Sequence, residues 1–252
     1  MRAIIIAAGR GSRLGELTDD LPKCLMTVGG KTLLKRQIDS FRANGIQDIS
    51  VVRGYQAEKI DLTGLRYFLN DDFKRNNILH SLMYAREIMD EGFVATYSDI
   101  LFKDSVLSSL SSCSSDLAVV VDLDWKEGYV GRTEHPVEEA EKVVLDDDGV
   151  VQTIGKDISS STISGEFIGM LKCTRAGAEC FKEYFDRATE EYDLEAPFAR
   201  AASFRNAYIT DLLQYMVDDG VRVDSVLIKR GWQEIDVRDD LRRANQYESQ
   251  DI

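Results

Sequence analysis

Residues 7–14 carry the side chains best suited to chemistry, in the order Ala-Ala-Gly-Arg-Gly-Ser-Arg-Leu. Glycine lets backbone amides approach a ligand closely, and consecutive N–H groups in a turn form a site for an anion. Arg13 lies inside this loop, and Lys23 follows ten positions later. An arginine fork and a lysine point charge beside such a loop would neutralise a phosphorylated ligand. The spacing therefore predicts a phosphate-binding loop.

Two better-known phosphate motifs do not fit this segment. The dinucleotide fingerprint needs glycines at relative positions one, three and six, whereas this chain has them at 9, 11 and 15. A Walker motif ending in Gly30-Lys31-Thr32 would need a glycine where Leu25 stands. Glycines in a turn after a strand also serve backbone geometry alone, so the prediction depends on the two basic side chains.

The balance of charge restricts what the chain binds. The 252 residues include 44 acidic and 31 basic side chains, which gives a formal net charge of −13. Nucleic-acid binding by phosphate neutralisation needs a basic face, and this excess of acid opposes it. We expect no nucleic-acid partner, and any anionic ligand must be met by local basic groups.

The composition is that of an ordinary globular protein. Apolar residues make up 44% of the chain, and no apolar run approaches the roughly 20 residues that span a bilayer. The apolar stretch at the start is too short for a signal peptide, and the four cysteines form no C-x-x-C pair. We expect no membrane partner and a reducing, cytoplasmic location.

Strands and helices alternate along the chain and must position these residues. Short apolar runs predict strands at Ala3–Ala8, Ile49–Val52, Leu65–Leu69, Phe93–Tyr97, Leu117–Val121, Phe167–Cys173 and Val223–Ile228. Helical spacing predicts helices at Thr32–Asn44, Ile78–Met89, Ala178–Glu191, Ile209–Val217 and Arg238–Tyr247. An acidic turn at 146–149 predicts a hairpin over Glu141–Val151. The pattern predicts one α/β domain with a mixed, mostly parallel sheet and ligands at the carboxyl ends of its strands.

Two carboxylates stand at positions that suit this edge. Asp99 follows the predicted strand Phe93–Tyr97, where an oxygen ligand would suit Mg²⁺; the alternative is a helix N-cap before Ile100. Asp236 precedes the last predicted helix and fits an N-cap equally well. Asn77 and Ser81 flank a helix start, where they either contact a base or ribose or cap the helix, which chemistry alone favours.

The loop of residues 7–14 together with Lys23 resembles the signature A-A-G-x-G-[ST]-R-L-x(8)-K of the nucleotidyltransferase superfamily, which includes sugar-1-phosphate nucleotidylyltransferases. Segments 76–82 and 97–102 look most like the small cytidylyltransferases that activate phosphocholine, aminoethylphosphonate and related phosphonates or phosphoamides. The resemblance implies a three-layer, nucleotide-diphospho-sugar transferase-like fold in a single domain, 1–252. About 1–100 would bind the nucleotide and about 101–252 the acceptor, with the hairpin as a small insertion around the acceptor site.

The resemblance also implies roles for individual residues. Asp99 and Asp236 would hold Mg²⁺. Lys23 would bridge the α-phosphate and the acceptor, and Arg13 would hold the β- and γ-phosphates. The nucleotide would be surrounded by Ala8, Gly9, Arg10, Gly11, Ser12, Arg13, Asn77 and Ser81. The acceptor would contact Lys23, Glu141, Lys156 and Glu166.

The side chains beyond these leave the acceptor open. Trp125, Tyr129 and Trp232 either form a cage for a quaternary ammonium or belong to the core. Acidic residues near Glu138 favour an amine-bearing acceptor, whereas the basic residues of the same region suit one with an extra carboxylate. Those basic residues are Lys126, Arg132, Lys142 and Lys156.

The expected reaction is Mg²⁺-dependent transfer of CMP from CTP to a small phosphonate or phosphorylated molecule, with release of pyrophosphate. The nucleophile is already an anion and needs no general base, which agrees with only two histidines, His80 and His135, neither with the spacing of a hydrolase triad. A sugar-1-phosphate uridylyl- or thymidylyltransferase and a non-catalytic nucleotide sensor remain as alternatives. The expected partners are CTP and the acceptor, with a homodimer left open.

Overall fold

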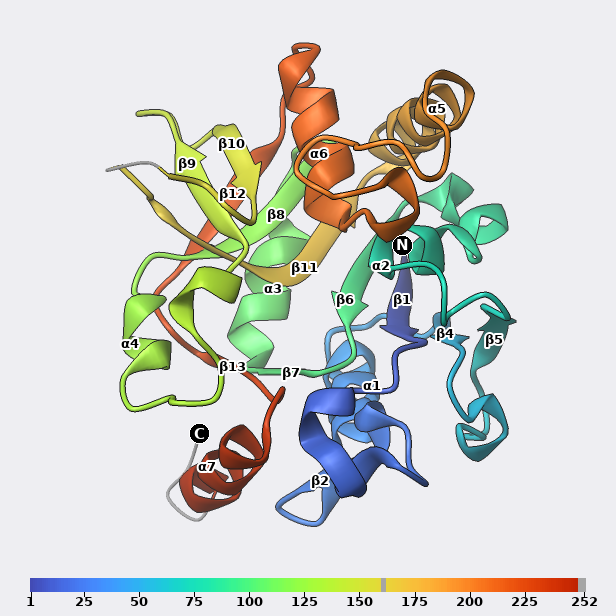
Figure 1. Ribbon diagram of the computed structural model, residues 1–252, viewed down its shortest axis with the longest axis vertical. Coiled ribbons are helices and arrows are strands. Elements are labelled where there is room, and N and C mark those ends of the chain that lie inside the picture. Colours follow the sequence, from blue (N-terminus) through green and yellow to red (C-terminus); the bar gives the residue numbers. More distant parts are fainter. Residues whose placement is uncertain (160–161, 249–252) are drawn as a thin grey trace.

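A computed structural model describes residues 1–159 and 162–248 of the chain (Figure 1). The strands are β1 (Arg2–Ala7), β2 (Thr27–Val28), β3 (Lys31–Thr32), β4 (Ile49–Arg53), β5 (Arg66–Leu69), β6 (Phe93–Tyr97), β7 (Ile100–Phe102), β8 (Leu117–Asp122), β9 (Lys142–Leu145), β10 (Val151–Gly155), β11 (Gly165–Cys173), β12 (Asp224–Ile228) and β13 (Trp232–Glu234). The α-helices are α1 (Leu33–Ala43), α2 (Ile78–Met83), α3 (Asp104–Ser112), α4 (Lys126–Tyr129), α5 (Arg175–Glu191), α6 (Ile209–Asp218) and α7 (Arg238–Glu248). Short 3₁₀ segments lie between them.

A nine-stranded sheet forms the centre of the molecule. Its main path runs β10-β9-β11-β6-β1-β4-β5, and β8 pairs with β11 and with β12. The pairs among β5, β4, β1 and β6 are parallel, as is β8 with β12, whereas β11 is antiparallel to β6, β8 and β9. Because β10 is antiparallel to β9, only β10 and β11 among these nine strands run against the others. The predicted single α/β domain with a mixed, mostly parallel sheet is confirmed.

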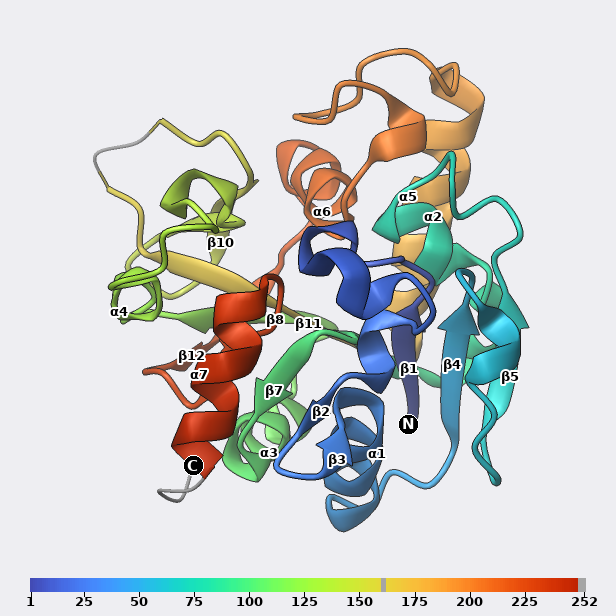
Figure 2. The same cartoon turned by 60° about the horizontal axis from the view of Figure 1, so that its bottom comes forward.

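Helices cover both faces of the sheet, which explains why β1 is apolar throughout. Ile4 and Ile6 pack into a core with residues of α2, α5 and α6, while Ala3 and Ile5 pack into a second core with residues of α1 and α3. Successive side chains of a strand point to opposite faces, so a strand covered on both sides alternates between two cores. Figure 2 shows the two groups of helices on either side of the sheet.

Most predicted elements are found within one to three residues of their expected ends, but the helix predicted over Ile78–Met89 is wrong as a single helix. The chain forms α2 and then a separate 3₁₀ segment, Arg86–Glu91. Apolar residues three apart share a face in both kinds of helix, so the spacing did not distinguish them. The predicted hairpin is formed by β9 and β10.

Two short strand pairs were not predicted. β2 pairs with β3, and β7 pairs with β13 in an antiparallel two-stranded sheet. The second pair matters for the site, because it joins the segment after Asp99 to the segment before Asp236. Figure 2 shows α7 beside β7 and β2. Among the described residues, no helix is both long and apolar enough to cross a membrane.

Candidate active site

The loop after β1 brings its backbone against Lys23. Gly11 has φ +71°, and a Cβ built there would lie 2.8 Å from the Cβ and Cδ of Lys23. Glycine is therefore required at this position both for its backbone conformation and for the close approach of the lysine stem. A Cβ built on Gly9 would meet nothing within 4 Å, and its φ is not positive. The space beside Gly9 is thus open, as a ligand-binding loop needs.

Lys23 lies between the two carboxylates that were predicted to bind a metal. Its Nζ donates to Oδ2 of Asp99 at 2.8 Å and to Oδ1 of Asp236 at 2.7 Å, and its side chain is buried. Burial opposes a charge on Lys23, but the two carboxylates outweigh it and raise the pKa of the ammonium above its ordinary value. Lys23 is therefore a buried cation that stays charged. It joins Asp99 and Asp236, which lie 76 and 213 positions after it in the sequence.

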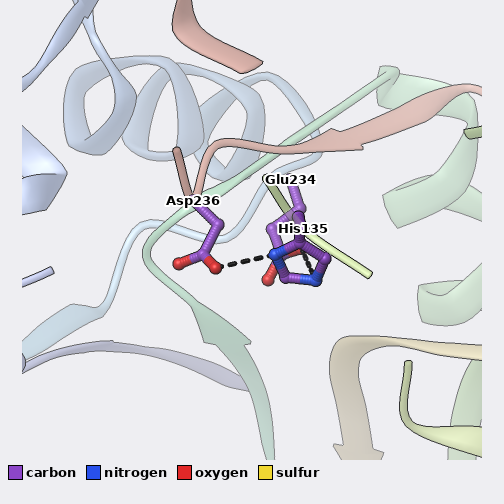
Figure 3. A group of neighbouring side chains, drawn as sticks. All are labelled: His135, Glu234 and Asp236. Atoms are coloured by element: carbon purple, nitrogen blue, oxygen red, sulfur yellow. Dashed lines mark hydrogen bonds and ion pairs between the residues drawn. The ribbon is translucent and has the colours of Figure 1, made fainter. Parts of the chain in front are cut away.

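Asp236 is held by two further side chains besides Lys23. Arg13 Nη1 lies 2.7 Å from its Oδ2, and His135 Nδ1 lies 2.8 Å from the same oxygen (Figure 3). Burial alone would favour the protonated acid, but the hydrogen bond with His135 and the charge of Lys23 lower the pKa of Asp236 well below its usual range. Asp236 is thus a carboxylate at neutral pH, although it is buried.

Glu234 and His135 complete a set of donors that the sequence did not reveal as a group. His135 Nε2 lies 3.5 Å from Oε2 of Glu234, and one ligand atom from each of His135, Glu234 and Asp236 lies within 4.8 Å of the others (Figure 3). Burial and the neighbouring acids raise the pKa of Glu234. Glu234 is the last residue of β13 and Asp236 follows it by two positions, a spacing that puts side chains on one face where the chain continues extended. This two-residue spacing was the feature of the sequence that could have predicted that Glu234 and Asp236 lie together.

The donor set fits a hard divalent cation. Oδ1 of Asp99 is buried and has no hydrogen-bond partner among the described residues, so this oxygen is free to serve as a ligand. Asp99 and Asp236 each place an oxygen within 2.8 Å of one nitrogen, which brings them close enough to bind one ion or its water. Carboxylate oxygens are the protein ligands that Mg²⁺ prefers.

A cavity of about 350 Å³ joins the loop, the carboxylates and the side chains predicted for the acceptor. Of the residues predicted around the nucleotide, the structure brings these together along it: Ala8, Gly9, Gly11, Ser12, Arg13, Asn77 and Ser81. Arg10 does not line it and instead pairs with Asp19 at 2.7 Å on the surface. Ser81 also accepts a hydrogen bond from Asn70, and the Asn77 side chain donates to the carbonyl of Asn206 rather than capping α2.

All four residues predicted for the acceptor line this cavity: Lys23, Glu141, Lys156 and Glu166. Lys156 Nζ lies 2.9 Å from Oε2 of Glu139 and 4.5 Å from the ring centre of Tyr208. Glu141 accepts hydrogen bonds from the hydroxyls of Tyr97 and Thr210, and burial raises its pKa to about 7.

Glu166 is the least satisfied of these acids. Its Oε1 accepts a hydrogen bond from the Tyr129 hydroxyl at 2.6 Å, while Oε2 is buried and has no partner among the described residues. Burial raises its pKa to about 8. Trp125 is buried in the protein with its ring 5.9 Å from that of Tyr129, while Tyr129 and Trp232 line the cavity. Because Trp125 does not line the site cavity, the three aromatic residues form no cage there.

Comparison with known proteins gives relatives along the whole chain. A CTP:phosphoglutamine cytidylyltransferase of Campylobacter jejuni subsp. jejuni is 29% identical over 257 residues, which cover 96% of this chain and 98% of that protein. A choline-phosphate cytidylyltransferase of Streptococcus pneumoniae is 35% identical over 115 residues, which cover 44% of this chain and 50% of that protein. The second match thus spans half of that relative.

Solved structures share the fold. A CTP:phosphocholine cytidylyltransferase from Streptococcus pneumoniae matches with a TM-score of 0.75 at 24% identity, over 98% of both chains. An inositol-1-phosphate CTP transferase from T. maritima matches with a TM-score of 0.73 at 24% identity, over 95% of this chain and 90% of that one. At such identities these two matches establish the architecture alone.

The family follows from a separate match. The model of the MobA-like NTP transferase domain matches residues 3–165, which include the glycine loop, Lys23 and Asp99. Since this match covers more than half of the chain, the protein belongs to the family of MobA-like NTP transferase domains.

Proposed function

We propose that the protein is a Mg²⁺-dependent cytidylyltransferase that transfers CMP from CTP to a small phosphonate or phosphorylated molecule and releases pyrophosphate. The observation that carries this proposal is the position of Lys23, within 2.8 Å of both Asp99 and Asp236 and against the open glycine loop. A cation, two carboxylates and free backbone amides at one point match the charges of a metal-bound triphosphate.

The nucleotide half of the proposed site is built from the first hundred residues. The loop at 8–13 offers backbone N–H groups and Arg13 to the triphosphate, and Asn77 and Ser81 lie where the base and ribose would bind. The choice of CTP is supported by the relatives, two of which are named for cytidylyl transfer. Asp99 and Asp236 would hold Mg²⁺, which neutralises phosphate charge when it is bound.

The acceptor half uses residues from the rest of the chain. Lys156 lines the same cavity and would hold the phosphate or phosphonate of the acceptor. Oε2 of Glu166 is buried without a partner, and a cationic nitrogen on the acceptor would both satisfy this oxygen and favour the ionised form of the carboxyl, so the site favours an acceptor that carries such a group. Two of the four basic side chains that would suit an extra carboxylate have other partners: Arg132 pairs with Asp240, and Lys142 donates to the carbonyl of Glu138.

The proposed reaction needs positioning and charge rather than a general base. An oxygen of the acceptor's phosphate or phosphonate attacks the α-phosphorus of the nucleotide in line, the bond to the β-phosphate oxygen breaks, and pyrophosphate leaves with its electron pair. Lys23 stays charged throughout and would bridge the α-phosphate and the incoming oxygen, while Arg13 would turn from Asp236 toward the leaving pyrophosphate. Holding the acceptor oxygen and the α-phosphorus in line for attack lowers the barrier, because the two reactants no longer have to meet by diffusion.

Pyrophosphate release tests the proposal. The purified protein is incubated with Mg²⁺, each of CTP, UTP, dTTP and ATP, and a panel of phosphocholine, 2-aminoethylphosphonate, phosphonoformate, glutamine phosphate and glucose 1-phosphate. We expect turnover with CTP and one of the nitrogen-bearing acceptors. Turnover with UTP or dTTP and the hexose phosphate, without turnover of CTP, would instead establish the sugar nucleotide alternative.

The control for the metal and for a sensing role is Asp99→Asn. We expect this variant to fold and to lose about 10²-fold or more in kcat, because it removes a charged ligand of the ion. Binding of CTP without turnover of any acceptor by the unaltered protein would favour a nucleotide sensor. Full activity in Asp99→Asn would overturn the metal assignment.

A further inference from the structure

The ion pair between Arg132 and Asp240 is almost completely buried, although neither residue lines the site cavity. Nε and Nη2 of Arg132 donate to Oδ1 and Oδ2 of Asp240, both at 2.7 Å. The side chain of Arg132 is 8% exposed and that of Asp240 is 1% exposed. A buried, two-pronged pair of this kind fixes two segments of chain in one relative geometry.

The same carboxylate also fixes the backbone at Asp236. Oδ2 of Asp240 accepts hydrogen bonds from the backbone N–H groups of Asp236 and Val237, both at 3.0 Å. Taken alone, these bonds are the reach-back half of a capping box at the start of α7. Ordinary capping does not recruit a buried arginine from a distant segment, however, and here Arg132 comes from a position 108 residues away.

Arg132 belongs to a segment, Tyr129–His135, that we call the strap. At one end of the strap, Nδ1 of His135 donates to the Asp236 carboxylate at 2.8 Å, and Nε2 lies 3.5 Å from Glu234. In its middle, Arg132 also comes within 3.4 Å of Glu234. Asp240 thus holds the backbone of Asp236, and Arg132 holds the strap that carries His135. The ion pair therefore connects both groups that contact Asp236.

Arg132 and Asp240 do not line the site cavity. A second hollow of about 1200 Å³ is lined by Arg132 and Asp240, and it shares Tyr129, Glu166 and Glu234 with the site cavity. Within the strap, Tyr129 thus lines both spaces, His135 lines only the site cavity, and Arg132 lines only the second hollow. Arg132 and Asp240 therefore act on the site through other residues.

We propose that Arg132 and Asp240 are positioning residues for metal binding: their ion pair holds Asp236 by its backbone and, through the strap, holds His135 against its carboxylate. The inference rests on the proposed function in taking Asp236 as a metal ligand. Groups that orient a ligand in this way typically change metal affinity by about 10- to 100-fold when they are altered.

The test measures Mn²⁺ binding to the full chain by electron paramagnetic resonance, with and without CTP. Arg132→Lys keeps the positive charge but cannot make both hydrogen bonds to Asp240 in the same geometry. We expect at least about tenfold weaker Mn²⁺ binding by this variant. The matched control is Arg86→Lys, because Arg86 also makes a two-pronged pair, with Asp186, at a remote surface. We expect the control to bind Mn²⁺ like the unaltered protein.

A double variant keeps the test valid if the lysine variant folds poorly. Arg132→Met with Asp240→Leu removes both partners together, so neither of them is left as an unpaired buried ion, although the backbone N–H groups of Asp236 and Val237 lose their acceptor. Circular dichroism establishes that this variant folds. Weaker Mn²⁺ binding by this folded variant supports the proposal, and unchanged binding overturns it while leaving the proposed function intact. If the unaltered protein binds no Mn²⁺ even with CTP, the proposed function fails, and this inference fails with it.

Discussion

Lys23 contributes both to the stability of the fold and to the proposed reaction. It neutralises Asp99 and Asp236, which would otherwise lie close together without this counter-charge. Removing one partner of a buried ion pair costs about 3–5 kcal/mol of unfolding free energy, because it leaves an uncompensated buried charge. The same ammonium is the cation that the proposed reaction needs beside the α-phosphate.

The variant Lys23→Met separates these two roles. We expect it to lower the unfolding free energy by about 3 kcal/mol and to abolish transfer activity. Divalent cations should restore part of the lost stability, because they take over the neutralisation of the two carboxylates. Denaturant unfolding with and without Mg²⁺ measures both effects.

Lys172→Met is the matched control for this comparison. Lys172 is also buried, but its Nζ donates to backbone carbonyls of Ser111 and Cys113 rather than to carboxylates. We expect its loss to destabilise the fold without any recovery on addition of Mg²⁺. Recovery by Mg²⁺ in both variants would contradict a metal site at Asp99 and Asp236.

Glu141 predicts a pH dependence of stability. Its pKa is raised by burial from 4.5 to about 7, so the folded chain keeps a proton that the unfolded chain loses above pH 4.5. The unfolding free energy therefore falls as pH rises from about 4.5 to 7, by up to about 3 kcal/mol from this group. Above about pH 7 the Glu141 carboxyl is ionised in both the folded and the unfolded chain, so this group lowers the unfolding free energy no further.

Glu141→Gln removes this titration while keeping the shape of the side chain. We expect the stability of the variant relative to the unaltered protein to increase between pH 5 and pH 8, by an amount on the order of 3 kcal/mol. Thermal or denaturant unfolding at the two pH values checks it. A constant difference between the two proteins would show that Glu141 titrates at its ordinary pKa.

At the residue scale, sequence reasoning found the groups that follow a recognisable element and missed those brought in by distant contacts. Arg13, Lys23 and Asp99 follow the first strand or end another, so their neighbourhood was predictable. His135 lies in a stretch without periodic pattern, and only the folded chain brings it to Asp236. The family resemblance implied that Arg10 contacts the nucleotide, but its side chain pairs with Asp19 on the surface.

At the scale of elements, the site depends on the pairing of two three-residue strands. β7 and β13 pair antiparallel, and the backbone N–H of Ile235 donates to the carbonyl of Asp99 at 2.9 Å. This small sheet places Asp99 and Asp236 on either side of Lys23. Strands this short carry no periodic signal, and their partners are about 130 positions apart in the sequence, so the pairing was not predictable.

The larger elements were predictable because they are covered on both faces. A strand such as β1, β6 or β8 is apolar at nearly every position, which separates it from helices and surface strands. The divided helix at 78–91 was not predictable in the same way. Gly92 stands at its end with φ +77° and packs against the carbonyl of Cys173, a contact that belongs to the folded protein.

The glycine loop gives a prediction at this scale. Gly11→Ala would force a left-handed alanine at a cost of about 1–2 kcal/mol, and its Cβ would displace Lys23. We expect kcat/KM for pyrophosphate release to fall by about 10²-fold or more, because Lys23 moves from its position between the carboxylates. Steady-state kinetics and denaturant unfolding measure the two effects.

Gly30→Ala provides the control for backbone strain. Gly30 has φ +78°, close to that of Gly11, but a Cβ there would meet nothing within 4 Å. We expect a similar backbone cost with activity preserved. Equal loss of activity in both variants would mean that the close approach of Lys23 to the loop has no role in catalysis.

At the scale of the whole molecule, a net charge of −13 is compatible with a triphosphate ligand because the charge is unevenly placed. The first 23 residues hold four basic side chains (Arg2, Arg10, Arg13 and Lys23) and three acidic ones, so the loop region is locally close to neutral. Two of the 44 acidic residues, Asp99 and Asp236, lie beside Lys23. The excess acid elsewhere acts at longer range and is screened by salt.

The site also connects the two ends of the described chain, so ligand binding should stabilise the molecule as a whole. Lys23 contacts Asp236, and α7 is tied to the segment near β2 by a hydrogen bond from the backbone of Gly29 to Asn245. CTP with Mg²⁺ at 100 times its dissociation constant adds about 2.7 kcal/mol of stability. For a domain of this size we expect Tm to rise by about 5–10 °C.

Hydrogen exchange locates this stabilisation. We expect CTP with Mg²⁺ to slow amide exchange both in the loop at 8–13 and in the distant segment from β13 to the start of α7, because Asp236 and Lys23 are held by one ligand. UTP and ATP at the same concentration serve as controls for the base, and Asp99→Asn serves as the control for the metal. Protection confined to the first hundred residues would mean that Asp236 does not take part in nucleotide binding, since a metal shared by both carboxylates cannot order one end of the chain alone.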